Sequence, residues 1–262
     1  MVLLSEELYR KWQPIKASRI LLGALVQAKE QDMQESILNR LKDYWHCRRF
    51  LNLHYDLQKI LEEEQNSYSS YKYGQSYFYQ SCKPCQITGL RSTEARIASM
   101  GLQSLVKGAR VLDIGCNVGF LDLELAPFAQ SIAAFDINLY CIKIAQRVAD
   151  QLNIKNVHFI CTTFEDFHEE QLYDVVLSFA NHHTYDQNTT QSLEEYFLKI
   201  STYLRPGGGM LFESHAPTYE TPEQLSRTLK VISKFFDIKE QSVLKKGNKG
   251  DKGRTFCVCV KK

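Results

Sequence analysis

The stretch VLDIGCNVGF at residues 111–120 decides the fold of this chain of 262 residues. It begins as an apolar β-run, reaches Asp113, turns through Gly115 and Gly119, and enters a helical pattern at residues 120–125. A strand that turns sharply through glycine into a helix brings its backbone close to a ligand and points the helix N-terminus at it. The spacing therefore predicts a βα unit that can carry a binding site, although such turns also serve as structural corners.

Further apolar runs follow this stretch at regular intervals. They are predicted strands at residues 131–136, 157–161, 173–179 and 210–213. Helical patterns lie near residues 119–129, 138–153, 189–204 and 222–234, and before the opening stretch at residues 50–64 and from 93 to about 105. Two alternating runs, 236–239 and 254–260, flank a hairpin tip at 245–253. This alternation of strands and helices predicts an α/β fold with a doubly wound, mostly parallel sheet.

The succession resembles the class I S-adenosylmethionine-dependent methyltransferases over residues 88–262. The resemblance implies a Rossmann-like sheet of seven strands with an antiparallel last strand, and S-adenosyl-L-methionine as the cofactor. The terminal hairpin favours this family over NAD-binding proteins. The turn also argues against a dinucleotide, because Gly115 and Gly119 do not make the Gly-x-Gly-x-x-Gly pattern.

Residues 1–75 are expected to form a helical extension and linker, and residues 76–262 the S-adenosylmethionine-binding catalytic domain. Up to about residue 65 the apolar residues recur at three- and four-residue spacing, which indicates helices. These helices could cap the catalytic domain, act as a substrate lid, or form a surface for a homo-oligomer. The tyrosine-rich segment 66–80 likewise fits a packing strap, a pocket wall or a platform for nucleic-acid bases.

Composition sets further bounds. A formal net charge of +2 neither requires nor excludes nucleic acid. No apolar run reaches the length of about 18 residues that crosses a bilayer, and the start turns acidic at Glu6, too early for a secretory signal. A cytoplasmic protein is therefore expected. Among eight cysteines, Cys82 and Cys85 have ligand-like spacing, but no second pair completes a zinc site. Reduced packing thiols such as Cys161 are expected instead of a structural metal.

By the family resemblance, the cofactor's methionine portion binds at Asp113 and at the turn from Gly115 through Asn117 to Gly119. Asn117 stands where relatives often have glycine, and asparagine tolerates the positive φ that this turn needs. Asp136 ends the second strand, and its two oxygens can accept both ribose hydroxyls.

The third strand departs from the family pattern, which often has an acidic residue for the adenine amine. The adenine is therefore assigned to the Thr163 hydroxyl or to the Phe164 backbone N–H. Ser178, at the end of the fourth strand, completes the expected cofactor contacts.

Histidines gather where the fourth and fifth strands end. His182 and His183 follow one strand, and Glu213 and His215 follow the other. Adjacent strand ends would bring them beside the methyl group, and histidine is the usual general base near neutral pH. His182 or His183 is the first candidate for the base and His215 the second, while Glu213 would orient an imidazole or bind a substrate hydroxyl. A divalent metal held by histidine and Asp186 stays open, but no metal is expected.

Within the class, the chain is similar to the tRNA wobble-uridine methyl/carboxymethyltransferase branch. The similarity lies in Thr93 to Arg96, in Glu213 and in Arg254, and it implies that Arg254 could hold a carboxylated cofactor. The two arginines beside the helix start, Arg91 and Arg96, join Arg254 as expected substrate contacts. The branch's tyrosine is missing, with His183 in about its place, and the N-terminal region is much shorter.

These observations favour O-methylation of a hydroxylated small molecule or glycan, since the chain lacks the Asn/Asp-Pro-Pro-Tyr ending typical of amino-group methylation. One alternative is methyl or carboxymethyl transfer to tRNA. A second is a non-catalytic cofactor-binding scaffold, although the histidines argue against it.

Overall fold

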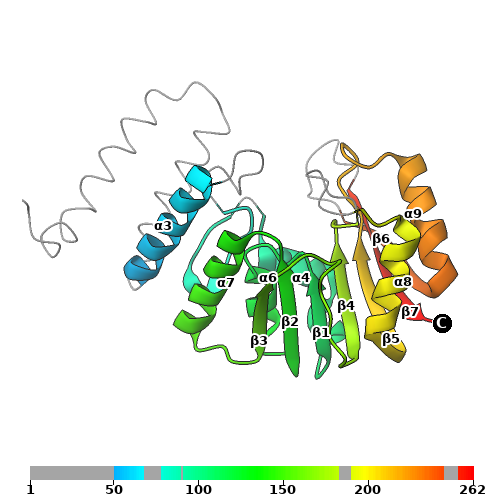
Figure 1. Ribbon diagram of the computed structural model, residues 1–262, viewed down its shortest axis with the longest axis horizontal. Helices are drawn as coiled ribbons and strands as arrows, with labels where there is room; N and C mark the ends of the chain where they lie inside the picture. The colour runs from blue at the N-terminus through cyan, green and yellow to red at the C-terminus, as the bar shows by residue number, and fades with distance from the viewer. Residues whose placement is uncertain (1–49, 68–77, 90, 183–189, 245–252) are drawn as a thin grey trace, which may run out of the picture.

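The computed structural model describes residues 50–67, 78–89, 91–182, 190–244 and 253–262. Its centre is a seven-stranded sheet in the order β3-β2-β1-β4-β5-β7-β6 (Figure 1). The strands are β1 (Arg110–Ile114), β2 (Ser131–Asp136), β3 (Val157–Cys161), β4 (Tyr173–Phe179), β5 (Leu204–Glu213), β6 (Phe236–Leu244) and β7 (Arg254–Lys261). Strands β1 to β5 pair in parallel, whereas β7 pairs antiparallel with β5 and β6. The predicted Rossmann-like sheet with its antiparallel last strand is confirmed.

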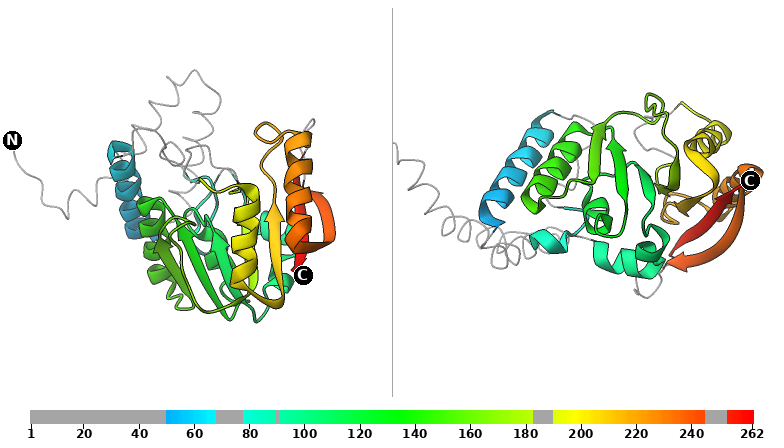
Figure 2. Two further views of the ribbon diagram at one scale, coloured as in Figure 1. Left: turned by 45° about the vertical axis from the view of Figure 1, so that its right-hand side comes forward. Right: turned by 90° about the horizontal axis from the view of Figure 1, so that it is seen from below.

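Helices cover both faces of this sheet (Figure 2). They are α3 (Leu51–Ser67), α4 (Thr93–Met100), α5 (Leu102–Leu105), α6 (Phe120–Leu125), α7 (Leu139–Leu152), α8 (Leu193–Tyr203) and α9 (Pro222–Phe235), with a 3₁₀ turn η3 (Lys83–Cys85). Successive strand residues face opposite ways. Val111 accordingly packs in the core with α3 to α7, and Leu112 in the core with α8 and α9.

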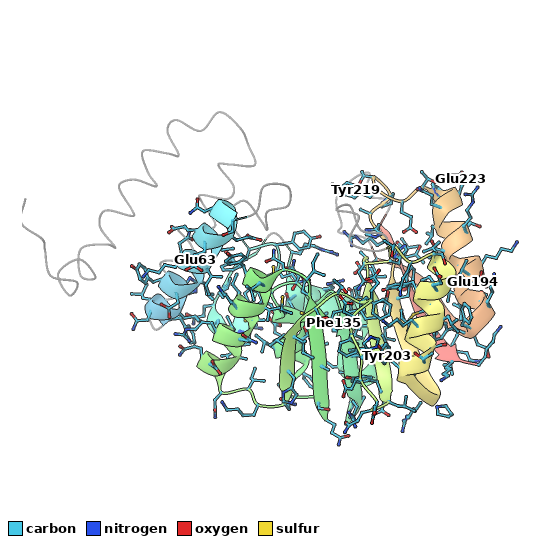
Figure 3. The ribbon with its side chains drawn as sticks, viewed as in Figure 1. Glu63, Phe135, Glu194, Tyr203, Tyr219 and Glu223 are labelled. Atoms are coloured by element: carbon cyan, nitrogen blue, oxygen red, sulfur yellow. The ribbon has the colours of Figure 1, made fainter. Side chains whose placement is uncertain are left out.

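Aromatic rings fill the layer between the sheet and α8. Phe135 on β2 stacks on Phe167 at 4.7 Å between ring centroids, and Phe167 packs on Tyr203 at 5.3 Å. Figure 3 labels Phe135 and Tyr203 on the sheet and at the end of α8. Stacked and tilted rings at these separations are favourable. This packing fixes α8 on the sheet and thereby sets where β5 begins.

Three predicted boundaries needed correction. The helix expected from residue 93 to about 105 breaks at Gly101, whose φ of 64° is left-handed and ends α4. The helix expected over 119–129 ends at Leu125, shortly before Pro127, which cannot continue a helix. β5 begins at Leu204 instead of Met210, because Tyr173 already pairs with Leu204 across an irregular register.

The helix expected over residues 50–64 is present as α3, and it packs beside α7 in Figure 1. Its side chains Leu53, Leu57 and Leu61 are buried in the same core as α7. The helices predicted before residue 50 and most of the tyrosine-rich segment lie outside the described residues, so the boundary after residue 75 stays a prediction. None of the described helices is long and apolar enough to cross a bilayer.

Candidate active site

The turn after β1 has the conformation that its sequence predicts. Gly115, Asn117 and Gly119 have φ values of 70°, 57° and 65°, so asparagine does take the left-handed conformation. At Gly119 a Cβ would lie 2.4 Å from the Phe159 ring and 2.9 Å from the Ala145 Cβ. Glycine is therefore required there twice over, for its φ and for the close approach of the turn to β3 and α7.

Asp136 connects this turn to α7. Its Oδ2 accepts a hydrogen bond from the Asn117 N–H and its Oδ1 one from the Asn138 N–H, each at 2.9 Å. Asn138 in turn caps α7 by accepting from the Tyr140 N–H at 2.9 Å. A carboxylate has about four acceptor positions, so these two bonds are compatible with the ribose contacts predicted for Asp136.

Two buried acids lie under the turn. Burial raises the pKa of Asp113 to about 7, while Arg96 acts to lower it. Burial also raises the pKa of Asp122 well above its usual value, and the nearby Asp113 raises it further. One carboxyl group of the pair is therefore protonated near neutral pH. Sequence reasoning missed Asp122, although an acid on an otherwise apolar helix face, FLDLEL, was a usable signal.

The expected adenine and fourth-strand contacts are engaged within the protein. The Thr163 hydroxyl donates to Asp166 Oδ2 at 2.8 Å and accepts from the Asp166 N–H at 3.0 Å. Phe164 is buried and lies 6.1 Å from the Phe135 ring. The Ser178 hydroxyl is buried and bonds to Asn181 Oδ1 at 2.9 Å. The cofactor contacts assigned to Thr163, Phe164 and Ser178 stay predictions.

Glu213 lies among the three predicted arginines. Its Oε2 forms an ion pair with Arg96, and its Oε1 lies 3.3 Å from Arg91 and 3.7 Å from Arg254. Burial opposes ionisation of Glu213, but Arg96, Arg91 and Arg254 outweigh it and lower its pKa. The carboxylate therefore stays charged and is a poor proton acceptor. Its expected orientation of an imidazole is not what the described residues show, because its contacts are with guanidinium groups.

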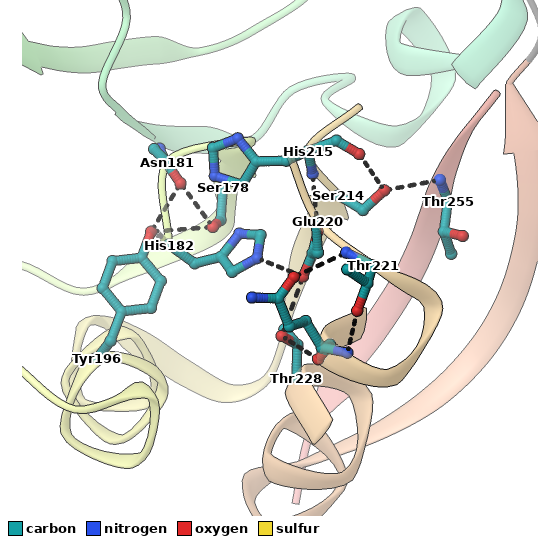
Figure 4. Close-up of polar contacts among 11 residues, drawn as sticks. Ser178, Asn181, His182, Tyr196, Ser214, His215, Glu220, Thr221, Thr228 and Thr255 are labelled. Carbon is teal, nitrogen blue, oxygen red and sulfur yellow. Dashed lines mark hydrogen bonds and ion pairs between the residues drawn. The ribbon is translucent and has the colours of Figure 1, made fainter. Parts of the chain in front are cut away.

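Glu220, which sequence reasoning missed, contacts both candidate histidines that the structure describes, His182 and His215 (Figure 4). Its Oε1 lies 3.0 Å from His182 Nε2, and its Oε2 accepts from the His215 backbone N–H at 3.0 Å. The two imidazole rings lie 4.8 Å apart between centroids. Thr228 also donates to Glu220 Oε1 at 3.1 Å. No sequence signal marked Glu220, because its partners come from two different strand ends.

His183 and Asp186 lie outside the described residues. Within the described part of the chain, no cluster of three or more His, Cys, Asp or Glu side chains could hold a metal ion. Cys82 and Cys85 are both buried free thiols. The prediction that Cys161 is buried was wrong, because it ends β3 at the exposed edge of the sheet.

Comparison with known proteins identifies the family. The sequence profile of a family described as "Methyltransferase domain" matches residues 105–252, more than half of the chain. The chain belongs to this methyltransferase family. Membership confirms the predicted class, a class I S-adenosylmethionine-dependent methyltransferase domain.

Curated relatives match the methyltransferase over about half of its length. A fatty-acid O-methyltransferase of Mycolicibacterium smegmatis is 27% identical over 130 residues, 48% of this chain and 44% of that protein. A malonyl-[acyl-carrier protein] O-methyltransferase of Acetivibrio thermocellus is 33% identical over 135 residues, 48% of this chain and 44% of that protein. The chain thus spans less than half the length of these relatives.

Solved structures show the same fold. The N-methyltransferase NodS from Bradyrhizobium japonicum, in complex with S-adenosyl-L-homocysteine, has a TM-score of 0.53 at 16% identity and covers 64% of this chain and 86% of its own. The [4+2]-cyclase SpnF has a TM-score of 0.51 at 15% identity, over 64% of this chain and 81% of its own. Because a cyclase shares it, the fold alone does not fix the reaction.

The methyltransferase's own residues fit the cofactor of its family. Gly119 lets the turn pack closely on Phe159, where any Cβ would collide, and the Asn117 Oδ1 is buried with no hydrogen-bond partner among the described residues. Asp113 and Asp136, the acids predicted to contact the cofactor's ammonium and ribose, lie at the carboxyl ends of the two adjoining strands. S-adenosyl-L-methionine is therefore the cofactor that this site suits.

Proposed function

We propose that the enzyme transfers a methyl group to an oxygen atom of a hydroxylated small molecule or glycan, with a histidine as the general base. One observation carries this proposal: the single carboxylate of Glu220 holds both His182 and His215 where β4 and β5 end. The two curated relatives described above are O-methyltransferases, which supports oxygen as the acceptor.

When bound, S-adenosylmethionine supplies an electrophilic methyl group on a positively charged sulfur and leaves as S-adenosylhomocysteine. Asp113, Asp136 and the turn around Asn117 would hold it. The acceptor hydroxyl gains the methyl group and gives its proton to an imidazole. Alignment and proton removal are the main contributions that this chemistry asks of the protein.

His215 is assigned as the proton acceptor and His182 as its positioning residue. The His182 side chain is fully buried, and its Nε2 faces the Glu220 carboxylate. Burial acts to raise the pKa of Glu220, but His182 and the His215 N–H outweigh this effect and lower it. An ionised Glu220 keeps the proton of His182 on Nε2. The His182 ring then packs against His215 and fixes its orientation.

The test begins with an acceptor found by mass spectrometry after cell extract is incubated with the protein and methyl-labelled cofactor. On that acceptor, His215→Gln should lower kcat by about 10²-fold or more at neutral pH, as for a lost general base, and partly recover at high pH. His182→Gln and Glu220→Gln should lower kcat less and move the acidic limb of the pH profile. His158→Gln, on an exposed position of β3, is the matched control.

Labelled methyl groups on nitrogen or carbon would refute the oxygen assignment. A normal rate across pH for His215→Gln, with a large loss for His182→Gln, would exchange the roles of the two histidines. If His182→Gln, His215→Gln and Glu220→Gln all keep normal rates, the general-base mechanism is wrong for the described histidines.

A second candidate is methyl or carboxymethyl transfer to tRNA. It is favoured by Arg254, which lies 3.7 Å from Glu213, because both residues carry the resemblance to that branch. The same labelling experiment with total tRNA tests it, because label would then appear in nucleosides after digestion.

A further inference from the structure

Three arginines from distant parts of the sequence converge on one buried carboxylate. Arg91 lies just before α4, Arg96 lies in its first turn, and Arg254 is the first residue of β7. All three form ion pairs with Glu213. Their side chains are only 14%, 11% and 17% exposed, and that of Glu213 is fully buried. Arg91 also donates to the Tyr79 hydroxyl at 3.1 Å. This arginine cluster is therefore built into the strand ends and is not a loose surface patch.

The cluster carries more positive charge than Glu213 can balance. Three guanidinium groups face this one carboxylate. Among the three, only Arg96 also acts to lower the pKa of the buried Asp113. Half-buried positive charge is costly unless it is paired. The unbalanced part of this charge therefore favours a negatively charged ligand.

The arginines also keep hydrogen-bond donors for such a ligand. Arg96 Nε is buried and has no hydrogen-bond partner among the described residues. Arg254 reaches Glu213 at 3.7 Å, which is beyond hydrogen-bond distance, so this contact is electrostatic. A guanidinium has five N–H donors in a planar fork that matches the oxygens of carboxylate and phosphate.

The cluster adjoins the histidines along the backbone. Glu213 lies two residues before His215, and the Thr255 N–H next to Arg254 donates to Ser214 Oγ at 2.9 Å. Arg96 lies over the Phe179 ring, 4.8 Å from its centroid, where β4 ends. Both groups therefore lie at the same edge of the sheet, where β4 and β5 end and β7 begins.

We infer that the methyl acceptor carries an anionic oxygen group, a carboxylate or a phosphate, that binds between Arg91, Arg96 and Arg254. This inference rests on the proposed function, since it names the substrate class of the same site. The substrate class is then a hydroxylated acid or a phosphorylated or acidic sugar, and not a neutral alcohol. Glu213 keeps the three arginines together and sets how tightly the anion binds.

The experiment measures anion binding without turnover. Inorganic phosphate and malonate are titrated by calorimetry into the cofactor-free protein and into protein saturated with S-adenosylhomocysteine. We expect one saturable site, weakened at least tenfold in Arg254→Gln and Arg91→Gln. Glu213→Gln should bind the anion more tightly, because it removes the internal competitor. Arg110→Gln is the matched control: Arg110 is also part-buried near a carboxylate and an aromatic ring, but at the opposite end of β1.

Folding is checked by thermal melting, and Arg254→Lys is the second variant if Arg254→Gln is unstable. It keeps the charge but loses the fork, so it should bind the anion with intermediate affinity. The stronger of the two anions shows whether the site suits a phosphate or a carboxylate.

Two results would overturn the inference. Anion binding that S-adenosylhomocysteine abolishes would assign the arginines to the cofactor's own carboxylate. No saturable binding, or equal binding in all arginine variants, would make them mere counterions of Glu213. Either result leaves the histidine kinetics untouched, and silent histidine variants would leave the anion site untouched, so the two proposals fail separately.

Discussion

Replacing Gly119 by alanine tests how the cofactor turn is built, because a near-perfect control exists in the same chain. Gly119 and Gly101 have φ values of 65° and 64°, so the backbone penalty for alanine is the same at both, about 1–2 kcal/mol. The two positions differ in the space available to an added Cβ. A Cβ at Gly101 meets nothing within 4 Å, whereas one at Gly119 lies 2.4 Å from the Phe159 ring and 2.9 Å from Ala145.

Forcing a methyl group into such a packed contact costs roughly a further 1–3 kcal/mol. We therefore expect Gly119→Ala to lower the free energy of unfolding by about 2–5 kcal/mol and Gly101→Ala by about 1–2 kcal/mol. The assay is equilibrium unfolding in urea of the cofactor-free protein, with S-adenosylhomocysteine affinity measured by calorimetry. Only Gly119→Ala should also weaken the cofactor, because only this turn contacts it in the proposed site.

A third variant tests directly whether the Phe159 ring causes the cost at Gly119. Phe159→Leu removes the ring atoms that the new Cβ would meet, so the double mutant should recover part of the loss, with a coupling energy of about 0.5–3 kcal/mol. Equal costs for Gly119→Ala and Gly101→Ala, or strict additivity with Phe159→Leu, would refute the argument that close packing against β3 demands this glycine.

Further predictions concern the acids and the imidazoles. Asp122→Asn should stabilise the protein by at least about 1 kcal/mol at pH 8 and hardly at all at pH 4, measured by urea unfolding. An Asp whose pKa is raised in the folded state destabilises the fold increasingly as the pH rises above its unfolded pKa of about 4. An effect that is constant with pH would contradict this. Asp136→Ala should weaken S-adenosylhomocysteine at least tenfold, about 1.4 kcal/mol, by calorimetry, and unchanged affinity in a folded variant would remove the ribose assignment. Long-range ¹H–¹⁵N spectra should show the His182 proton on Nε2, facing Glu220, and a proton on Nδ1 alone would break the proposed pair.

The sheet could be predicted from the sequence because its signals are local. The strands of the βα units are apolar runs that turn and capping residues separate. Asn117 indicated a left-handed turn, and the structure has one there. Boundaries failed where a tertiary contact decides them. β5 starts at Leu204 because Tyr173 is available to pair with it, which no local pattern reveals.

The site was predicted less well, because the residue types at the strand ends do not reveal which side chains they will contact in the fold. Glu213 and His215 are neighbours in sequence and both seemed suited to proton transfer. In the structure, Glu213 is paired with guanidinium groups, among them that of Arg91, which lies 122 residues earlier in the chain. His215 instead shares the Glu220 carboxylate with His182. Long-range contacts therefore divided one apparent cluster into two groups of different chemistry.

This division bears on how an acceptor would be oriented. The positively charged arginines around Glu213 and the two imidazoles beside Glu220 lie where β4 and β5 end, and they offer two polar anchoring points. An acceptor with its anion among the arginines has its hydroxyl directed to the imidazoles, because the reverse placement would put the anion beside the Glu220 carboxylate. The charge of Glu220 thus excludes the wrong orientation, and Glu213 limits how firmly the right one is held.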